Sequence, residues 1–201
     1  MATRQKTRFA ILGLLSWKPM SGYDIKKLVD VGLSHFWNEN YGQIYPTLES
    51  LVDDRLASKR EKTSVGKRKR FVYSITRKGE RAFEAWLREP TGMPIVRNEL
   101  QLKFFLSCNL PTSESVRLVQ EYQADQRAML EQYQESAAVL RRSIESGSCP
   151  EELDEILQVT SSASAERSEQ CKVFYLTLRH GILSIKARLA WCDEVLRSLE
   201  E

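Results

Sequence analysis

The spacing of apolar residues changes between residues 41 and 75, and this change restricts the fold more than any other feature of the chain. A helix beginning near Tyr41 is predicted by apolar residues that fall on one helical face, namely Ile44, Leu48, Leu51 and Val52. Residues 57–62 and 68–75 then predict two strands around a turn at 63–66, since the second strand alternates apolar and polar side chains. A short helix followed at once by a β-hairpin is therefore expected.

The hairpin carries a large excess of positive charge. Its only acid is Glu61, and its cations are Lys59, Arg60, Lys62, Lys67, Arg68, Lys69 and Arg70. Like charges that face each other across two strands repel, so this composition does not serve the stability of the hairpin itself. A polyanion that neutralises the charge from outside explains the excess better.

The outer face of the preceding helix carries polar groups that can contact base edges. Gln43, Thr47 and Ser50 are expected opposite the apolar stripe, with Tyr45 on the flank and Tyr41 at the start. A helix that presents amide, hydroxyl and phenol groups beside a basic hairpin suits the DNA major groove. The alternative is that these residues simply face solvent and that Tyr45 packs against the proline beside it.

The charge of the whole chain divides in the same direction. Residues 1–89 hold 18 basic and 10 acidic residues, whereas residues 90–201 hold 12 basic and 17 acidic ones. A proline- and glycine-containing segment, 90–94, separates the two parts and predicts a domain boundary. We therefore expect a DNA-binding domain over 1–89 and an all-helical domain over 90–201, although a charge asymmetry alone is also typical of solvated surfaces.

The last helical segment contains a seam of apolar residues with alternating steps of four and three. The seam consists of Cys171, Tyr175, Leu178, Ile182, Ile185, Leu189, Cys192, Leu196 and Leu199. Such a seam is typical of coiled-coil packing, either inside one subunit or between two copies. We favour a homodimer, because a DNA-binding protein that contacts one half-site with each subunit needs a two-fold interface. The residues expected at the dimer interface are Tyr175, Leu178, Ile182, Ile185, Leu189 and Leu196.

Other classes of function lack support in the sequence. The four cysteines show no metal-binding spacing, and no nucleophile–base pair or glycine-rich phosphate loop is present, so we expect neither an enzyme nor a cofactor. The apolar patch at residues 9–17 is too short to span a membrane. A cytoplasmic protein without a membrane partner is expected.

Three segments of the first half resemble the PadR family of winged-helix transcriptional regulators. They are Ser21–Ile25, Gly42–Leu48 and the basic wing that leads into Tyr73–Gly79. The second half is similar to the virulence-activator α C-terminal domain, on the segments Leu102–Phe105 and Trp191–Glu194. One departure is Arg55, where members of the family often have glycine.

The resemblance implies a homodimer, joined mainly through C-terminal helices, that places two winged helices on a palindromic operator. It implies that Gln43, Tyr45 and Thr47 contact DNA in or beside the major groove, and that the wing residues 67–70 contact the flanking minor groove or its phosphates. Repression is the commoner outcome in this family, and the virulence-activator resemblance leaves activation open.

The combined expectation is a mainly α protein. A winged helix-turn-helix of three to four helices plus a β-hairpin wing precedes an all-α dimerisation domain with long antiparallel or coiled-coil-like helices. The expected function is that of a sequence-specific DNA-binding regulator, with an unknown small-molecule effector as a compatible further partner. A sensing module for protein interactions is the alternative. The sequence names neither the operator, the target genes, the effector nor the helix that crosses between subunits.

Overall fold

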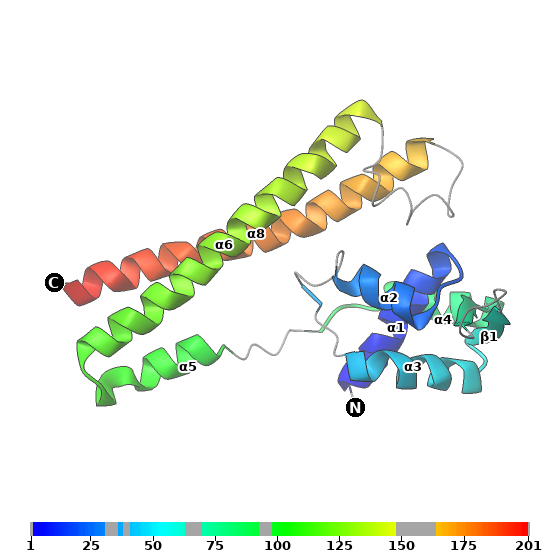
Figure 1. Ribbon diagram of the computed structural model, residues 1–201, viewed down its shortest axis with the longest axis horizontal. Helices are drawn as coiled ribbons and strands as arrows, with labels where there is room; N and C mark the ends of the chain where they lie inside the picture. The colour runs from blue at the N-terminus through cyan, green and yellow to red at the C-terminus, as the bar shows by residue number, and fades with distance from the viewer. Residues whose placement is uncertain are drawn as a thin grey trace. The chain divides into compact units, whose positions relative to one another are not determined.

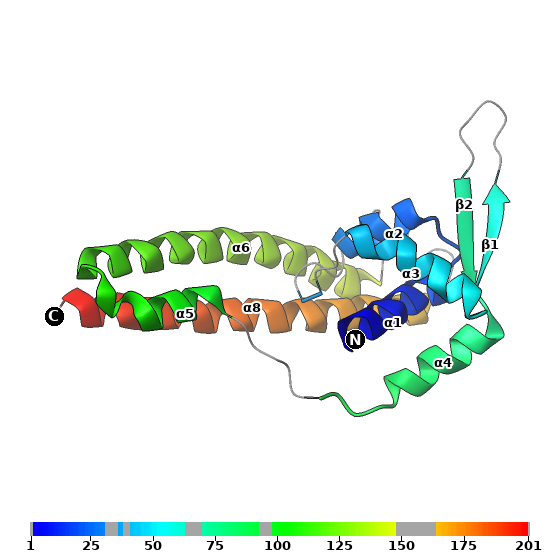
Figure 2. The same cartoon turned by 90° about the horizontal axis from the view of Figure 1, so that it is seen from below.

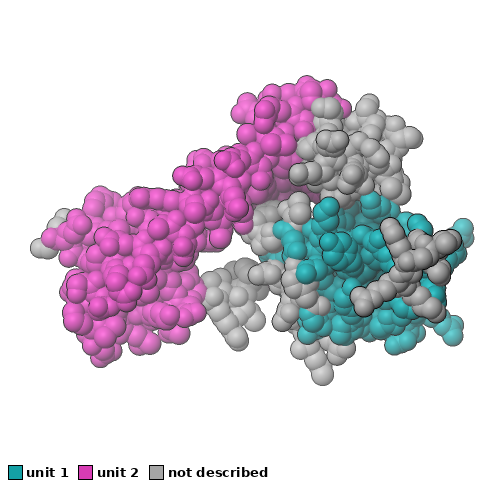
Figure 3. Space-filling view, in the orientation of Figure 1, with its two compact units in different colours: residues 1–91, 152–162 teal, residues 92–151, 163–201 magenta. Residues whose placement is uncertain are grey.

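The computed structural model describes residues 2–30, 36–37, 41–62, 70–92, 98–147 and 164–200. These residues divide into two compact units, one ending at residue 91 and the other beginning at residue 92 (Figure 3). Within these ranges, no helix combines the length and the apolar character needed to cross a membrane.

The N-terminal unit consists of helices followed by a hairpin and a further helix (Figure 1). Its elements are α1 (Ala2–Trp17), α2 (Gly22–Leu28), α3 (Tyr41–Asp53), β1 (Ala57–Lys62), β2 (Arg70–Ile75) and α4 (Arg77–Leu87). The two strands are antiparallel, with Ala57 opposite Ile75 and Lys62 opposite Arg70 (Figure 2). The predicted helix and hairpin are confirmed, while the predicted turn at 63–66 lies outside the described residues.

The starts of α2 and α4 are fixed by side-chain caps. The Ser21 hydroxyl accepts a hydrogen bond from the backbone N–H of Asp24, and the Asp24 carboxylate accepts one from the backbone N–H of Ser21. This reciprocal pair is a capping box. Thr76 accepts from the backbone N–H of Gly79 and caps α4 in a similar way.

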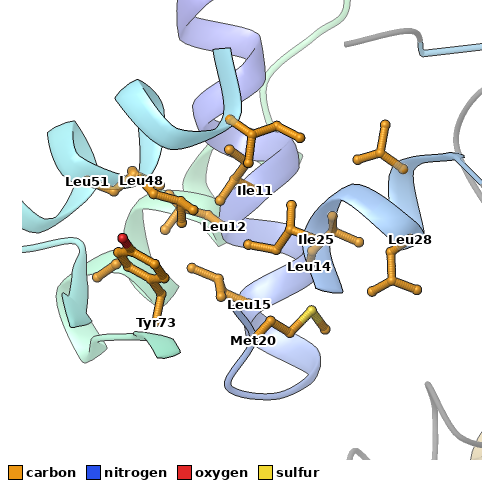
Figure 4. Packing of buried hydrophobic residues seen from close by; sticks show 13 residues of the cluster. Ile11, Leu12, Leu14, Leu15, Met20, Ile25, Leu28, Leu48, Leu51 and Tyr73 are labelled. Atoms are coloured by element: carbon orange, nitrogen blue, oxygen red, sulfur yellow. The ribbon is translucent and has the colours of Figure 1, made fainter. Parts of the chain in front are cut away.

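One apolar cluster holds α1, α2, α3 and the hairpin together. Figure 4 shows its side chains converging from these elements, with Leu12, Ile25 and Leu48 fully buried between the helices. Tyr73 contributes its ring from β2. The unit is closed on its other side by α4, where the rings of Phe9 and Trp86 stack at a centroid distance of 4.9 Å.

The turn from α3 into the wing has a left-handed residue that is not glycine. Arg55 has φ of 59°, its N–H donates to the carbonyl of Val52, and the N–H of Leu56 donates to the carbonyl of Leu51. These two hydrogen bonds form a Schellman motif, whose left-handed position glycine usually occupies. The turn therefore keeps the geometry expected for glycine although this chain has arginine there.

The C-terminal unit is entirely helical in its described residues. Its elements are α5 (Glu99–Leu106), the 3-10 helix η2 (Ser107–Asn109), α6 (Thr112–Ser146) and α8 (Ser164–Glu200). Figures 1 and 2 both show α6 and α8 side by side along their lengths and running in opposite directions. The predicted fold class, a winged helix-turn-helix followed by long antiparallel helices, is confirmed.

The seam on α8 packs inside its own chain. Leu178, Ile182 and Ile185 are almost fully buried in the isolated chain, on a helix whose main neighbour is α6. These three residues, which were expected at a dimer interface, are therefore already covered within one chain, which is the other packing that such a seam allows. The reason is that a four-three spacing specifies an apolar seam but not its partner, and here the antiparallel helix of the same chain supplies the partner. Tyr175, Leu189 and Leu196 are half-buried.

Candidate nucleic-acid interface

Several exposed side chains of α3 lie near its N-terminal end. Gln43 and Pro46 are exposed, and Tyr45 is 57% exposed. The Tyr45 ring rests on the first residue of α2, because a Cβ on Gly22 would lie only 2.6 Å from Cε1 of Tyr45. Gly22 therefore allows a close approach that holds the phenol at the outer surface. The side chain of Tyr41 lies outside the described residues.

Thr47 is not on the outer face, and its expected exposure is wrong. Its side chain is only 2% exposed, and its hydroxyl has no hydrogen-bond partner among the residues that the structure describes. Thr47 follows Ile44 by three residues and precedes Leu51 by four, so it shares their buried face. The sequence contained this spacing, but the polarity of threonine suggested the opposite face.

Ser50 is half-buried and accepts a hydrogen bond from a residue of α1. Arg8 of α1 donates from its Nη1 to the Ser50 hydroxyl at 2.8 Å, and its Nη2 forms an ion pair with Asp54 at 2.5 Å. Ser50 therefore helps to join α1 to α3. Nothing in the sequence pointed to this pairing, because the partners are more than 40 positions apart.

Glu49 connects α3 to the hairpin. Its Oε1 accepts hydrogen bonds from Lys59 Nζ at 2.7 Å and from the Tyr73 hydroxyl at 2.8 Å. The hydrogen bonds from Lys59 and Tyr73 hold the pKa of Glu49 below its ordinary value. Burial and the hydrogen bond to Glu49 raise the pKa of Tyr73, so its phenol stays protonated. Lys59 also lies over the Phe71 ring, 4.3 Å from its centroid.

Some cations of the hairpin form ion pairs with described acids, and others do not. Lys59 is paired with Glu49, as described above. Arg60 and Lys62 are exposed, and neither forms an ion pair with any residue that the structure describes. Lys67, Arg68 and Lys69 lie outside the described residues. At least two cations on β1 are therefore available to an external anion.

Arg70 is committed to α2. Its Nη2 donates to Asp24 Oδ1 at 2.5 Å, to Asp24 Oδ2 at 2.6 Å and to the Ser21 hydroxyl at 2.9 Å. Partial burial raises the pKa of Asp24, but hydrogen bonds from Ser21 and Arg70 together with the charge of Arg70 outweigh this effect. The pKa of Asp24 therefore lies below its ordinary value, and the carboxylate is ionised at neutral pH.

The distribution of these contacts defines the surface that can meet a nucleic acid. Two acids near the C-terminal end of α3 are paired, Glu49 with Lys59 and Asp54, directly after the helix, with Arg8, whereas Asp53 is exposed. The exposed amide and phenol at the start of α3 remain, and the same unit carries the exposed cations of β1. A helix start with polar groups next to a basic hairpin is the arrangement of a winged helix-turn-helix DNA-binding domain.

Comparison with known proteins identifies the family. The model of the transcriptional regulator PadR-like family matches residues 11–85, and that of the virulence activator alpha C-terminal domain matches residues 96–200. The chain is 33% identical to the negative transcriptional regulator PadR of Bacillus subtilis over 140 residues, covering 69% of the chain and 76% of that relative. The chain therefore belongs to the PadR-like family of transcriptional regulators. Its members are regulators of transcription and not enzymes, as predicted.

Solved structures agree with this assignment. Bacillus subtilis PadR in complex with operator DNA superposes with a TM-score of 0.75 at 25% identity, covering 96% of this chain and 98% of that one. The same protein in complex with p-coumaric acid gives 0.69 at 25% identity over 96% and 98%. The Vibrio cholerae virulence activator AphA gives 0.68 at 27% identity over 96% and 97%.

Proposed function

We propose that this regulator binds a palindromic operator as a homodimer in the cytoplasm and represses transcription. The observation that carries the DNA-binding part is the exposed pair Gln43 and Tyr45 at the start of α3, in one unit with the exposed cations Arg60 and Lys62, which form no ion pair with any described residue. The complex of Bacillus subtilis PadR with operator DNA supports it.

The roles of the proposed contact residues follow from their exposure. Gln43 would hydrogen-bond to base edges, while Tyr45 and Tyr41 would contact the groove wall or the backbone. The wing cations Lys67, Arg68 and Lys69 would neutralise phosphates. Thr47 has no place in this set because its side chain is buried. Ser50 joins only if the approach of DNA displaces Arg8.

The homodimer is proposed on a different surface from the seam. Val173, Leu176 and Leu183 lie on one exposed stripe of α8, each with more than half of its side chain exposed. Their steps of three and seven keep them on one helical face. A second copy that brings the same stripe would remove them from water, which the hydrophobic effect favours. We also propose that the two compact units are the domains 1–89 and 90–201.

Repression is proposed because the Bacillus subtilis relative is named a negative regulator. Activation is the second candidate, since the Vibrio cholerae neighbour is a virulence activator. The complex of PadR with p-coumaric acid supports control of this chain by a small-molecule effector, which would favour one of two geometries of the dimer.

The test begins with operator selection. Full-length protein would be used to recover duplexes from a random library, and their affinity would be measured against salt concentration. If each subunit neutralises about four phosphates, the dimer neutralises about eight and log K should fall against log salt with a slope of about −7. Failure to select any duplex at low salt would remove the DNA-binding function, and palindromic symmetry of the selected sites would support the dimer.

A further inference from the structure

We propose that Arg70 is a positioning residue, which fixes the wing against the N-terminus of α2 and does not itself bind a DNA phosphate. This inference rests on the DNA-binding function proposed above. It assigns the same task to Asp24 of α2 and to Ser21, the N-cap residue of that helix. The argument begins with the contacts of the guanidinium group.

The guanidinium of Arg70 is held by two oxygens of one carboxylate and by one hydroxyl. Nη2 lies within 2.6 Å of both Asp24 oxygens and 2.9 Å from the Ser21 hydroxyl. Hydrogen bonds between charged partners at such distances are stronger than neutral ones. Asp24 is ionised at neutral pH because the contacts described above depress its pKa. A phosphate that approached Arg70 would also approach this carboxylate, and the two anions would repel.

The Arg70–Asp24 contact holds β2 at a different level from the backbone contacts at Tyr73. A pair of backbone hydrogen bonds between Met20 and Tyr73, at 3.0 and 2.8 Å, attaches β2 to the segment before α2. The Lys59–Glu49 ion pair acts at the same level, since Lys59 is opposite Tyr73. Arg70 lies three residues closer to the turn, which is about 10 Å along a strand. It therefore limits the swing of the strand about the attachment at Tyr73.

The same helix start supports the other proposed DNA-contacting element. Gly22 lies between Ser21 and Asp24 in sequence and receives the ring of Tyr45 from α3. The capping box that Ser21 and Asp24 form fixes the backbone of this segment. The N-terminal turn of α2 thus contacts both the wing, through Arg70, and the exposed side chain of Tyr45 on α3. A change in the Arg70–Asp24 pair would alter their relative placement.

The experiment compares the variants Arg70→Met, Asp24→Asn and the double variant in the full-length protein. The matched control is Lys62→Met, which removes a cation from the position directly opposite Arg70 without touching the tie. Affinity would be measured on the selected duplex and on a random duplex over a range of salt concentrations. Hydrogen exchange of the free protein would report the order of β1 and β2, and thermal unfolding would confirm that each variant folds.

Positioning predicts that Arg70→Met and Asp24→Asn weaken operator binding by a similar factor, about three- to tenfold, and that the double variant is no worse than either. The salt slope should stay unchanged for both, and hydrogen exchange in the hairpin should rise in both but not in Lys62→Met. Loss of a positive charge alone cannot explain a weakening by Asp24→Asn, because that substitution removes a negative charge near DNA.

A phosphate contact predicts opposite results. Arg70→Met would then lower the salt slope by about one per subunit, and Asp24→Asn would leave binding unchanged or tighten it. Either result, or unchanged hydrogen exchange in the hairpin, would overturn the proposal. If the unmodified protein binds no duplex, the proposed function fails, and the exchange measurement alone still decides whether the tie orders the wing.

Discussion

The two units of the chain expose different kinds of apolar side chain. In the described part of the N-terminal unit, the large exposed ones are mainly aromatic, such as Tyr23, Tyr45 and Phe71. In the C-terminal unit they are mainly aliphatic, and they include Leu102, Leu106, Leu110, Val173, Leu176 and Leu183, together with Phe105 at 81% exposure.

This difference indicates which kind of partner the surface of each folded unit can bind. The N-terminal unit has a continuous core and an outer surface of cations, amide and phenol groups, so its remaining interactions are polar and aromatic. The C-terminal unit leaves an aliphatic surface in water, and large surfaces of this kind mark contacts with other proteins. The first unit therefore suits a charged partner and the second an apolar one, which agrees with DNA and a second copy of the chain.

Two neighbouring residues of α8 give the largest test of this comparison. Ile182 is 2% exposed and Leu183 is 55% exposed. Ile182→Ala should lower the free energy of unfolding by about 2–5 kcal/mol, because it leaves a cavity against α6. Leu183→Ala should weaken the proposed dimer by about tenfold while the folding of the single chain stays nearly unchanged. Equilibrium denaturation and sedimentation at several concentrations measure the two effects.

The concentration dependence separates the two roles. The effect of Ile182→Ala should persist at every protein concentration, whereas that of Leu183→Ala should vanish once the protein is dilute enough to be monomeric. A Leu183→Ala protein that dimerises as well as the unmodified chain would place the interface on another surface, with Phe105 of α5 as the next residue to replace.

Gln43 tests the polar surface of the N-terminal unit. Gln43→Ala should cost roughly 1–3 kcal/mol on the selected operator and relax discrimination against other sequences, because a base contact is lost. Binding to a random duplex should change little. Equilibrium titrations on both duplexes measure this difference. An equal loss on both would show that Gln43 acts on the backbone and does not read bases.

Thr47 is the matched contrast to Gln43 on the same helix. Thr47→Val keeps the shape of the side chain and removes a buried hydroxyl that has no hydrogen-bond partner in the described part of the chain. The free energy of unfolding should rise by about 1 kcal/mol, since an unsatisfied polar group no longer has to be desolvated. Operator affinity and selectivity should stay unchanged. A selective loss on the operator would mean that the Thr47 hydroxyl reaches DNA after a rearrangement of α3.

Sequence reasoning succeeded where local spacing alone determines the structure. The start of α3 at Tyr41 and β1 at residues 57–62 both follow from residues close together in the chain. It failed where the answer depends on a partner distant in sequence. The Arg70–Asp24 pair spans 46 positions, and the Glu49–Tyr73 contact spans 24. Charge alone suggested that Arg70 was free for phosphates.

The packing of the α8 seam also depends on a partner distant in sequence. The steps of four and three correctly indicated an apolar seam, but α6 has no comparably regular stripe that would have identified it as the partner. Polar residues such as Gln123 and Gln126 are buried on α6, and they bond to Asp193 and Arg188 of α8. A seam facing such a mixed surface is hard to recognise from apolar spacing. The exposed stripe that includes Leu183 was not recognised from the sequence, because it contains fewer large apolar side chains than the seam.

The smallest expected effect is at Arg55. It tests whether the backbone strain of this turn lowers the free energy of unfolding of the N-terminal unit. Its φ of 59° is in the left-handed region, where a side chain costs roughly 1–2 kcal/mol. Glycine avoids this cost but gains freedom in the unfolded chain, which offsets part of the benefit. Arg55→Gly should therefore raise the free energy of unfolding by about 0.5–1 kcal/mol, measured by denaturation. Its matched control is Asp53→Gly on the preceding turn of α3, which should destabilise by a similar amount because glycine disfavours helix. If Arg55→Gly also destabilises, contacts of the arginine side chain must outweigh the strain of its backbone.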